Sequence, residues 1–384
     1  MHPPRGLGSS NAGDLAERRI PALDGFRGLM TIAVVVSHYF GEVPHGFAAV
    51  SFGWIAVDCF FVLSGYLIAN LILDKMDRAN FFSVFYIRRF CRTLPCYFLC
   101  VVVLFLLLSA IAQREWADVG TWFPLWSYLA MSQNFYMTAA ESIGPHWLAP
   151  TWTLALEEHF YLVAPTLFLL VPRRYLFAVL ASCALAAVAI RSAINLSGPG
   201  LHLGAMCLLP GRADALICGM LFPVAVKTFS IDWSRWDQTI RIVPLVAILA
   251  VLALRLSDKY EGTVLFDIFG HMLVAIAAAF YIFALARGAP EARTCESPVL
   301  RFFGSISYST YLTHVAVLGL MHGLLLGQRP DLVNLRQLAT TLTALPVAIM
   351  VGWILTRLVE EPITAYGRSW RWGERRSQRL AAPR

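Results

Sequence analysis

Arg27 and His38 are the first residues along the sequence whose types and spacing could do chemistry. Their separation of about three helical turns places both on one face of a helix, roughly 16 Å apart along its axis. An imidazole can take a proton from a hydroxyl near neutral pH, so His38 is a candidate catalytic base. A histidine that bonds across helices for packing explains the same spacing, and the two interpretations are equally consistent with the sequence.

A second candidate is the run Glu157-Glu158-His159 inside an apolar segment. Ionised side chains are costly in apolar surroundings, so packing alone explains two adjacent carboxylates poorly. A carboxylate at this position can orient an imidazole or bind a substrate hydroxyl. We therefore treat Glu157 as a catalytic candidate that meets His38.

Arg89 and Arg92 are expected in a basic loop and lie three residues apart, on one face of any helix there. Guanidinium groups suit phosphates because they donate paired hydrogen bonds. The excess of basic residues on one side of a membrane protein accounts for them equally well.

The remaining polar candidates are divided between packing and binding roles. Ser64 precedes a glycine where another helix can approach closely, and no nucleophile elbow surrounds it, so packing is favoured. Arg212 and Asp214 can form a buried ion pair or bind a substrate. We assign to substrate binding, beside Arg89 and Arg92, the following residues: Asp58, Ser64, Arg212, Asp214, Ser307, Tyr311 and His314.

Composition decides what kind of element must position these side chains. Hydrophobic residues make up 58% of the 384 residues and charged residues 14%, and mean hydropathy is +0.62. Apolar blocks of about 16 to 25 residues match the length of a helix that crosses a bilayer. The sequence predicts an all-α transmembrane bundle with spans at 26–44, 54–73, 93–112, 150–171, 175–194, 203–226, 240–256, 264–286, 300–327 and 337–358.

Charge in the loops predicts the topology. Basic residues occupy every second loop, so we expect ten spans with both termini cytoplasmic, and we expect the segment 122–137 not to cross. The domains are then a disordered cytoplasmic tail at 1–20, a transmembrane domain at 21–365 and a basic cytoplasmic tail at 366–384. Glu360, near the end of the transmembrane domain, can pair with the arginine loop.

Charge and cysteine usage argue against several other functions. The net charge of +7 is spread over loops and the tail, where it also suits anionic lipid headgroups, and it forms no face for nucleic acid. The eight cysteines show neither metal-ligand spacing nor a disulfide framework. We expect no bound metal and no permanently bound cofactor, and the oligomeric state stays open.

The ordered set of motifs resembles the acyltransferase-3 family of membrane acyltransferases. The resemblance begins with Arg27, ten intervening residues and His38, and it continues to Glu360 and Pro362, nearly the whole chain. Thr153 and Thr313 are small departures from the family pattern. The other motifs that carry it are Asp58–Tyr66, Arg89 with Arg92 before Pro95, Trp152–Tyr161 with Glu157, Arg212 with Asp214, and Ser307–His314.

The resemblance implies a bacterial plasma-membrane enzyme that transfers an acyl group, often acetyl, from acyl-coenzyme A to a hydroxyl. The implied acceptor is a cell-surface or exported carbohydrate, including a lipid-linked one. It implies His38 as the essential residue, Arg27 as its partner and the arginine loop as the donor side. The chain is expected to be a stand-alone form without an appended hydrolase-like domain.

Two rival functions remain. Charges inside the membrane also mark the routes of transporters or flippases for sugars and lipids, although the repeated halves common in transporters are not found in the sequence. The same chemistry on a lipid or a secondary metabolite is equally compatible with the residues.

Overall fold

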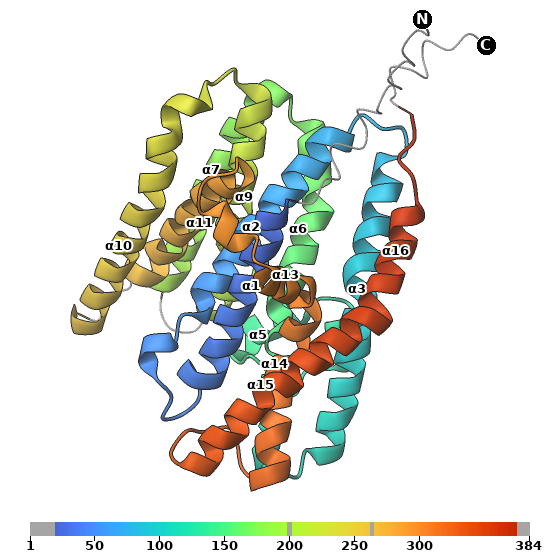
Figure 1. Ribbon diagram of the computed structural model, residues 1–384, viewed down its shortest axis with the longest axis vertical. Coiled ribbons are helices and arrows are strands. Elements are labelled where there is room, and N and C mark those ends of the chain that lie inside the picture. Colours follow the sequence, from blue (N-terminus) through green and yellow to red (C-terminus); the bar gives the residue numbers. More distant parts are fainter. Residues whose placement is uncertain (1–19, 198–201, 262–264, 375–384) are drawn as a thin grey trace, which may run out of the picture.

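The computed structural model describes residues 20–197, 202–261 and 265–374, with side chains between 255 and 261 left out. It consists of helices, and no strand occurs within those ranges (Figure 1). The predicted all-α class is confirmed. The tails expected at 1–20 and 366–384 fall largely outside the described residues.

Nine helical segments of the described ranges are long and apolar enough to cross a membrane. A tenth candidate is α1 (Pro21–Val36), which continues as a π-helical turn through Ser37–Gly41. Each expected span thus corresponds to a helix. The nine segments contain α2 (Gly53–Lys75), α3 (Phe81–Ile111), α6 (Thr151–Leu170), α7 (Arg173–Leu196), α8 (His202–Cys207) with α9 (Leu209–Thr228), α10 (Asp237–Glu261), α11 (His271–Ala286), α14 (Ser307–Leu326), and α15 (Leu335–Leu355) with α16 (Glu361–Ser369).

The segment 122–137 forms two short helices, α4 (Leu125–Leu129) and α5 (Gln133–Ala140). Helices of 5 and 8 residues are far shorter than the roughly 20 residues that a bilayer requires. Buried amides anchor the second one in the bundle. Gln133 Nε2 donates to Thr151 O at 3.1 Å, and Asn134 Nδ2 donates to Cys207 O at 2.7 Å.

Several expected boundaries differ in the structure, and the span expected at 203–226 is divided at Leu208 between α8 and α9. The basic loop before residue 93 is helical, because α3 begins at Phe81 and carries both Arg89 and Arg92. The span expected at 300–327 is broken at Ile306 into α13 (Pro298–Ser305) and α14. Helix α16 runs to Ser369, past the expected end at 358 and into the expected tail.

The two ends of the bundle differ in charge. Helix α2 ends at Lys75, α7 begins at Arg173 and α9 ends beside Lys227, and these helix ends share the upper side of Figure 1. Arg173 pairs there with Asp77, and Lys227 with Asp74. We call this the basic end, and we call the side of the loops 42–52 and 327–334 the neutral end.

The core is built where helices approach each other through small residues. The backbones of α2 and α9 touch so closely that a Cβ on Gly65 would overlap the carbonyl of Leu216, and one on Gly219 would overlap that of Val62. At the periphery, α10 presents leucines outward, with Leu245 67% and Leu249 65% exposed. An apolar outer face of this kind suits contact with lipid.

Helix α1 is held equally closely by α13. A Cβ on Gly28 would overlap the carbonyl of Leu300, and one on Gly25 would overlap that of Cys295 at the end of the preceding short helix α12 (Ala292–Cys295). A Cβ on Gly304 would in turn overlap the carbonyl of Asp24. These glycines bracket Arg27, so this contact positions its guanidinium.

We expect Gly28→Ala to destabilise the protein by about 1–3 kcal/mol, because the added methyl group forces α1 away from α13. The measurement is the thermal unfolding midpoint of purified protein in detergent, followed by tryptophan fluorescence. Leu29→Ala is the matched control, because the neighbouring Leu29 side chain is 39% exposed. Equal midpoints for the two variants would contradict this account.

Candidate active site

His38 lies in the π-helical turn that ends α1. Its Nδ1 is 2.9 Å from Val34 O and 3.3 Å from Nε2 of His314. A carbonyl oxygen only accepts hydrogen bonds, so Nδ1 of His38 carries the proton. His314 has the same tautomer, because its Nδ1 is 2.9 Å from Tyr311 O. In the neutral ring, Nε2 of His38 is then the nitrogen with the lone pair a base needs.

Glu42 is the carboxylate beside this imidazole. Its Oε2 lies 3.5 Å from Nε2 of His38, and its Oε1 accepts a 2.7 Å hydrogen bond from Ser37 Oγ. The Gly53 N–H donates to Ser37 Oγ at 2.8 Å. Sequence reasoning missed Glu42, although a carboxylate four residues after a histidine lies on the same helix face. The negative charge of Glu42 can stabilise the imidazolium form of His38.

The three predicted arginines lie together nearer the basic end. Arg27 faces Asp24 at 3.5 Å, and its charge interacts with those of Arg89 and Arg92. The guanidinium of Arg89 stacks over the ring of Tyr161 at 4.3 Å. Three like charges that share one site favour an anionic ligand between them.

Nearby carboxylates accept hydrogen bonds from hydroxyl groups. Glu157 Oε1 accepts from Ser64 Oγ at 2.6 Å, which gives Ser64 a role in holding Glu157. Glu158 accepts from Thr93 at 2.7 Å, and Glu360 accepts from Ser309 at 3.1 Å.

Glu360 and Arg92 interact electrostatically, whereas the sequence suggested a direct pair. Within the described part of the chain, neither Arg89 nor Arg92 has a carboxylate within salt-bridge distance. Their guanidinium groups therefore stay available for a ligand.

Glu157 does not occupy the position beside His38 that the sequence suggested. It lies among Ser64, Arg27 and Arg89, whereas Glu42 is the carboxylate at His38. The difference arises because Glu157 is held on the arginine side of α6 by Ser64 of α2.

Tyr311 lies between the two groups. Its hydroxyl accepts from Thr153 at 3.0 Å and interacts electrostatically with both Glu157 and Glu42. Its ring centroid is 5.8 Å from that of His314. Tyr311 is thus a polar side chain that interacts with the Glu157 group and also lies beside His314, the contact of His38.

Arg212 and Asp214 are both buried in ion pairs, although not with each other. Arg212 pairs with Asp58, whose second oxygen is 2.7 Å from His271 Nδ1. Asp214 pairs with Arg191 at 2.8 Å. Helices α2, α7, α9 and α11 meet through these contacts. Arg191 and His271 were missed because a partner from a distant segment leaves no local sequence signal.

Ser307 has a structural contact in the described chain. Its hydroxyl donates to Gly304 O at 2.9 Å, which ties the first residue of α14 to the end of α13 across the break at Ile306. Of the three residues predicted to share this face, His314 contacts His38 directly and Tyr311 lies beside it.

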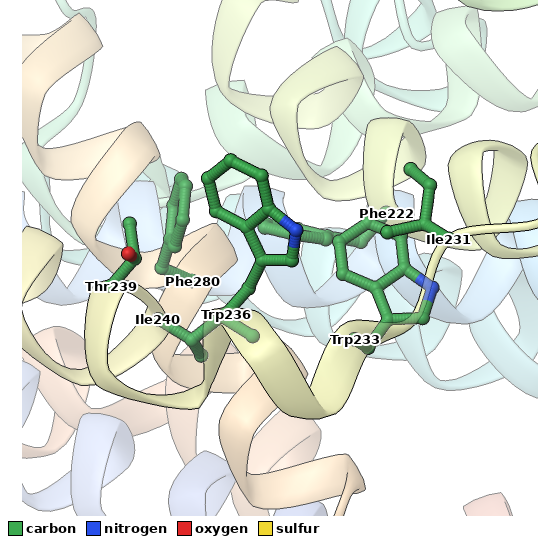
Figure 2. Close-up of a pocket in the computed structure, with 7 residues that line it drawn as sticks. All are labelled: Phe222, Ile231, Trp233, Trp236, Thr239, Ile240 and Phe280. Atoms are coloured by element: carbon green, nitrogen blue, oxygen red, sulfur yellow. The ribbon is translucent and has the colours of Figure 1, made fainter.

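An open apolar pocket of about 420 Å³ is separate from these groups. It lies between α9, α10 and α11, where the indole of Trp236 is placed between Phe280 and Trp233 (Figure 2). Its walls carry one hydroxyl, that of Thr239, and no ionisable side chain. In the described residues no group of three His, Cys, Asp or Glu side chains gathers to hold a metal.

Comparisons with known proteins agree with the resemblance seen in the sequence. Residues 20–357 match the family model of the acyltransferase-3 acyltransferase domain, so the chain belongs to this family. A Staphylococcus aureus (strain COL) protein is 27% identical over 378 residues, which cover 91% of this chain and 58% of that protein. No solved structure matches.

Two further relatives are likewise named as O-acetyltransferases. The peptidoglycan O-acetyltransferase OatA of Listeria monocytogenes is 27% identical over 92% of this chain and 57% of its own length. The O-acetyltransferase OatA of Staphylococcus aureus (strain NCTC 8325 / PS 47) is 25% identical over 91% of this chain and 58% of its own length. The chain thus spans under two thirds of the length of these relatives.

We expect Arg191→Met to destabilise the protein by about 3–5 kcal/mol, because it leaves Asp214 as an unpaired carboxylate in the core. The double variant Arg191→Met, Asp214→Leu removes both charges and should recover most of that loss. Unfolding midpoints in detergent compare the two. A double variant no more stable than the single one would contradict the pairing.

Proposed function

We propose that this member of the acyltransferase-3 family is a membrane O-acyltransferase that moves an acyl group from acyl-coenzyme A to a hydroxyl of a carbohydrate. Acetyl is the simplest group consistent with the names of the relatives. The observation that carries the proposal is the His38 imidazole, whose Nδ1 is tied to Val34 O while Nε2 keeps its lone pair.

The arginine group supports an anionic donor. Coenzyme A carries several phosphates, and Arg27, Arg89 and Arg92 offer guanidinium donors that suit them. We place the basic end in the cytoplasm, because Lys and Arg are retained there and acyl-coenzyme A is made there. The pantetheine arm then extends past Glu157 and Tyr311 towards His38.

The acceptor enters from the neutral end. The His38 side chain is 22% exposed there and that of Glu42 is 40% exposed, so a hydroxyl can reach Nε2. The name of the Listeria relative supports a carbohydrate acceptor such as a cell-wall glycan. Donor and acceptor thus approach the imidazole from opposite sides of a bacterial plasma membrane.

The transfer step follows from the tautomer of His38. Nε2 takes the proton as the acceptor oxygen attacks the thioester carbonyl carbon, and Glu42 stabilises the resulting imidazolium. The bond from carbon to sulfur then breaks, and the thiolate of coenzyme A leaves with the proton from His38. In an alternative sequence, Nε2 attacks the carbonyl carbon first, the bond from carbon to sulfur breaks and coenzyme A leaves as the thiolate. The acceptor oxygen then attacks the acyl-imidazole, the bond from carbon to Nε2 breaks, and the hydroxyl proton passes to the thiolate.

A direct test uses purified protein, labelled acetyl-coenzyme A and a panel of glycans that includes soluble peptidoglycan fragments. Transfer of the label to a glycan is the expected result. Movement of a sugar or lipid across vesicles without any thioester would instead identify a flippase.

We expect His38→Ala to abolish transfer, at least a hundredfold, because the base is lost while the fold remains. Abundance and the elution volume in detergent should stay unchanged. His45→Ala is the matched control, since His45 lies in the loop after α1 at the same end and is 69% exposed. Wild-type rates in His38→Ala would refute the mechanism.

We expect Arg89→Gln to weaken the binding of coenzyme A at least tenfold, because one phosphate partner is lost. The dissociation constant is measured by titration calorimetry of the full chain in detergent. Arg173→Gln is the control, because Arg173 belongs to the same basic end but is 52% exposed and pairs with Asp77 at 3.6 Å. Equal dissociation constants for both variants would place the donor elsewhere.

A further inference from the structure

A second imidazole, that of His271, is held by a carboxylate near the neutral end. Its Nδ1 lies 2.7 Å from Oδ2 of Asp58, and Oδ1 of Asp58 pairs with Arg212. The ion pair with Arg212 keeps Asp58 ionised, and an ionised carboxylate only accepts hydrogen bonds. Nδ1 of His271 therefore carries the proton, and its Nε2 has a free lone pair.

The imidazole is the accessible part of this network. The side chain of His271 is 18% exposed, whereas those of Asp58 and Arg212 are 0% and 2% exposed. The neighbouring pair of Arg191 and Asp214 is sealed as well, at 2% and 0%. Packing accounts for the sealed pairs. It does not account for a histidine that a carboxylate holds in one tautomer while part of the ring stays open.

Aromatic rings stand beside this imidazole. Trp54 meets the His271 ring edge to face, with centroids 5.5 Å apart, and Phe266 lies 5.0 Å from Trp54. Trp54 is itself partly accessible. Aromatic side chains together with one oriented polar group make up a typical small-molecule site, and the apolar face of a sugar ring packs well on an indole.

The His271 site and the His38 site share the first turns of α2. The Gly53 N–H holds Ser37, and a Cβ on Gly53 would lie 3.1 Å from Glu42 Oε1. The next residue is Trp54, whose ring contacts His271. Two imidazoles, those of His38 and His271, therefore flank one short stretch of backbone at the neutral end.

We propose that His271 binds the acceptor: its Nε2 accepts a hydrogen bond from one hydroxyl of a carbohydrate while another hydroxyl reaches His38, and the sugar ring packs on Trp54. This inference rests on the proposed function and makes it more specific. The acceptor is a polyhydroxylated molecule, because a simple alcohol cannot occupy both sites. Asp58 is then a positioning residue that acts through His271.

The key variant is His271→Asn. The Asn amide can still donate to Asp58, so the buried carboxylate stays satisfied, but nothing replaces Nε2. His271→Gln reaches the Nε2 position with its amide oxygen and is the conservative rescue. Trp54→Ala removes the aromatic wall, and Trp54→Phe retains it.

The experiment measures acceptor kinetics at saturating labelled acetyl-coenzyme A, with a glycan that the wild-type full chain acylates. We expect KM for the glycan to rise at least tenfold in His271→Asn and in Trp54→Ala, with partial recovery in His271→Gln and Trp54→Phe. We expect kcat and the dissociation constant of coenzyme A to stay within about twofold.

Every other outcome contradicts the inference in a distinct way. An unchanged KM in His271→Asn shows that this histidine does not touch the acceptor, while wild-type transfer leaves the proposed function intact. If His271→Asn weakens coenzyme A binding and lowers kcat as well as raising KM for the glycan, the role of His271 is purely structural. Absence of transfer by the wild type to every glycan removes the proposed function, and this inference falls with it.

Discussion

The absence of water inside a bilayer is the constraint on which this structure depends, because a charge placed there must find its partner within the protein. Asp58 meets Arg212 and His271, and Asp214 meets Arg191. These contacts join α2, α7, α9 and α11 across large separations in sequence. A helix that shifts away from this group leaves an ion unpaired, so the ion pairs hold the helices that carry the site in register.

The arginines near the basic end differ from these buried ion pairs, because Arg89 and Arg92 have no salt bridge within the described residues. Glu157 accepts its hydrogen bond from Ser64 and interacts electrostatically with Arg89 without forming a salt bridge to it among the described residues. Positive charge stays concentrated around Arg27, which the glycine contacts between α1 and α13 hold in place. In the proposed function, the phosphates of the acyl donor bind to these arginines. The hydrogen-bond partner of His38 is equally informative: Nδ1 faces the Val34 carbonyl oxygen, so Nδ1 is the nitrogen that carries the proton.

The sequence predicted the class of fold and the position of nearly every helix, because hydropathy reports how a segment meets lipid and does not depend on its neighbours. The sequence-based prediction was wrong where contacts with other helices set the bounds of a helix. Helix α3 extends twelve residues before the expected start at 93, and in this added part Arg89 stacks on Tyr161 of α6 while Arg92 interacts electrostatically with Glu360. The segment at 122–137 dips into the bundle because Gln133 and Asn134 find carbonyl partners there.

The sequence by itself determined which residue types lie in the membrane, and their order along the chain was enough to indicate the family. The tertiary structure alone decided the partner of each polar group. The carboxylate beside His38 is Glu42 and not the expected Glu157, and the partner of Asp214 is Arg191 and not the expected Arg212. The physical reason is that hydropathy and helical spacing are local properties, whereas an ion pair or a hydrogen bond between helices depends on the packing of segments that are far apart in the chain.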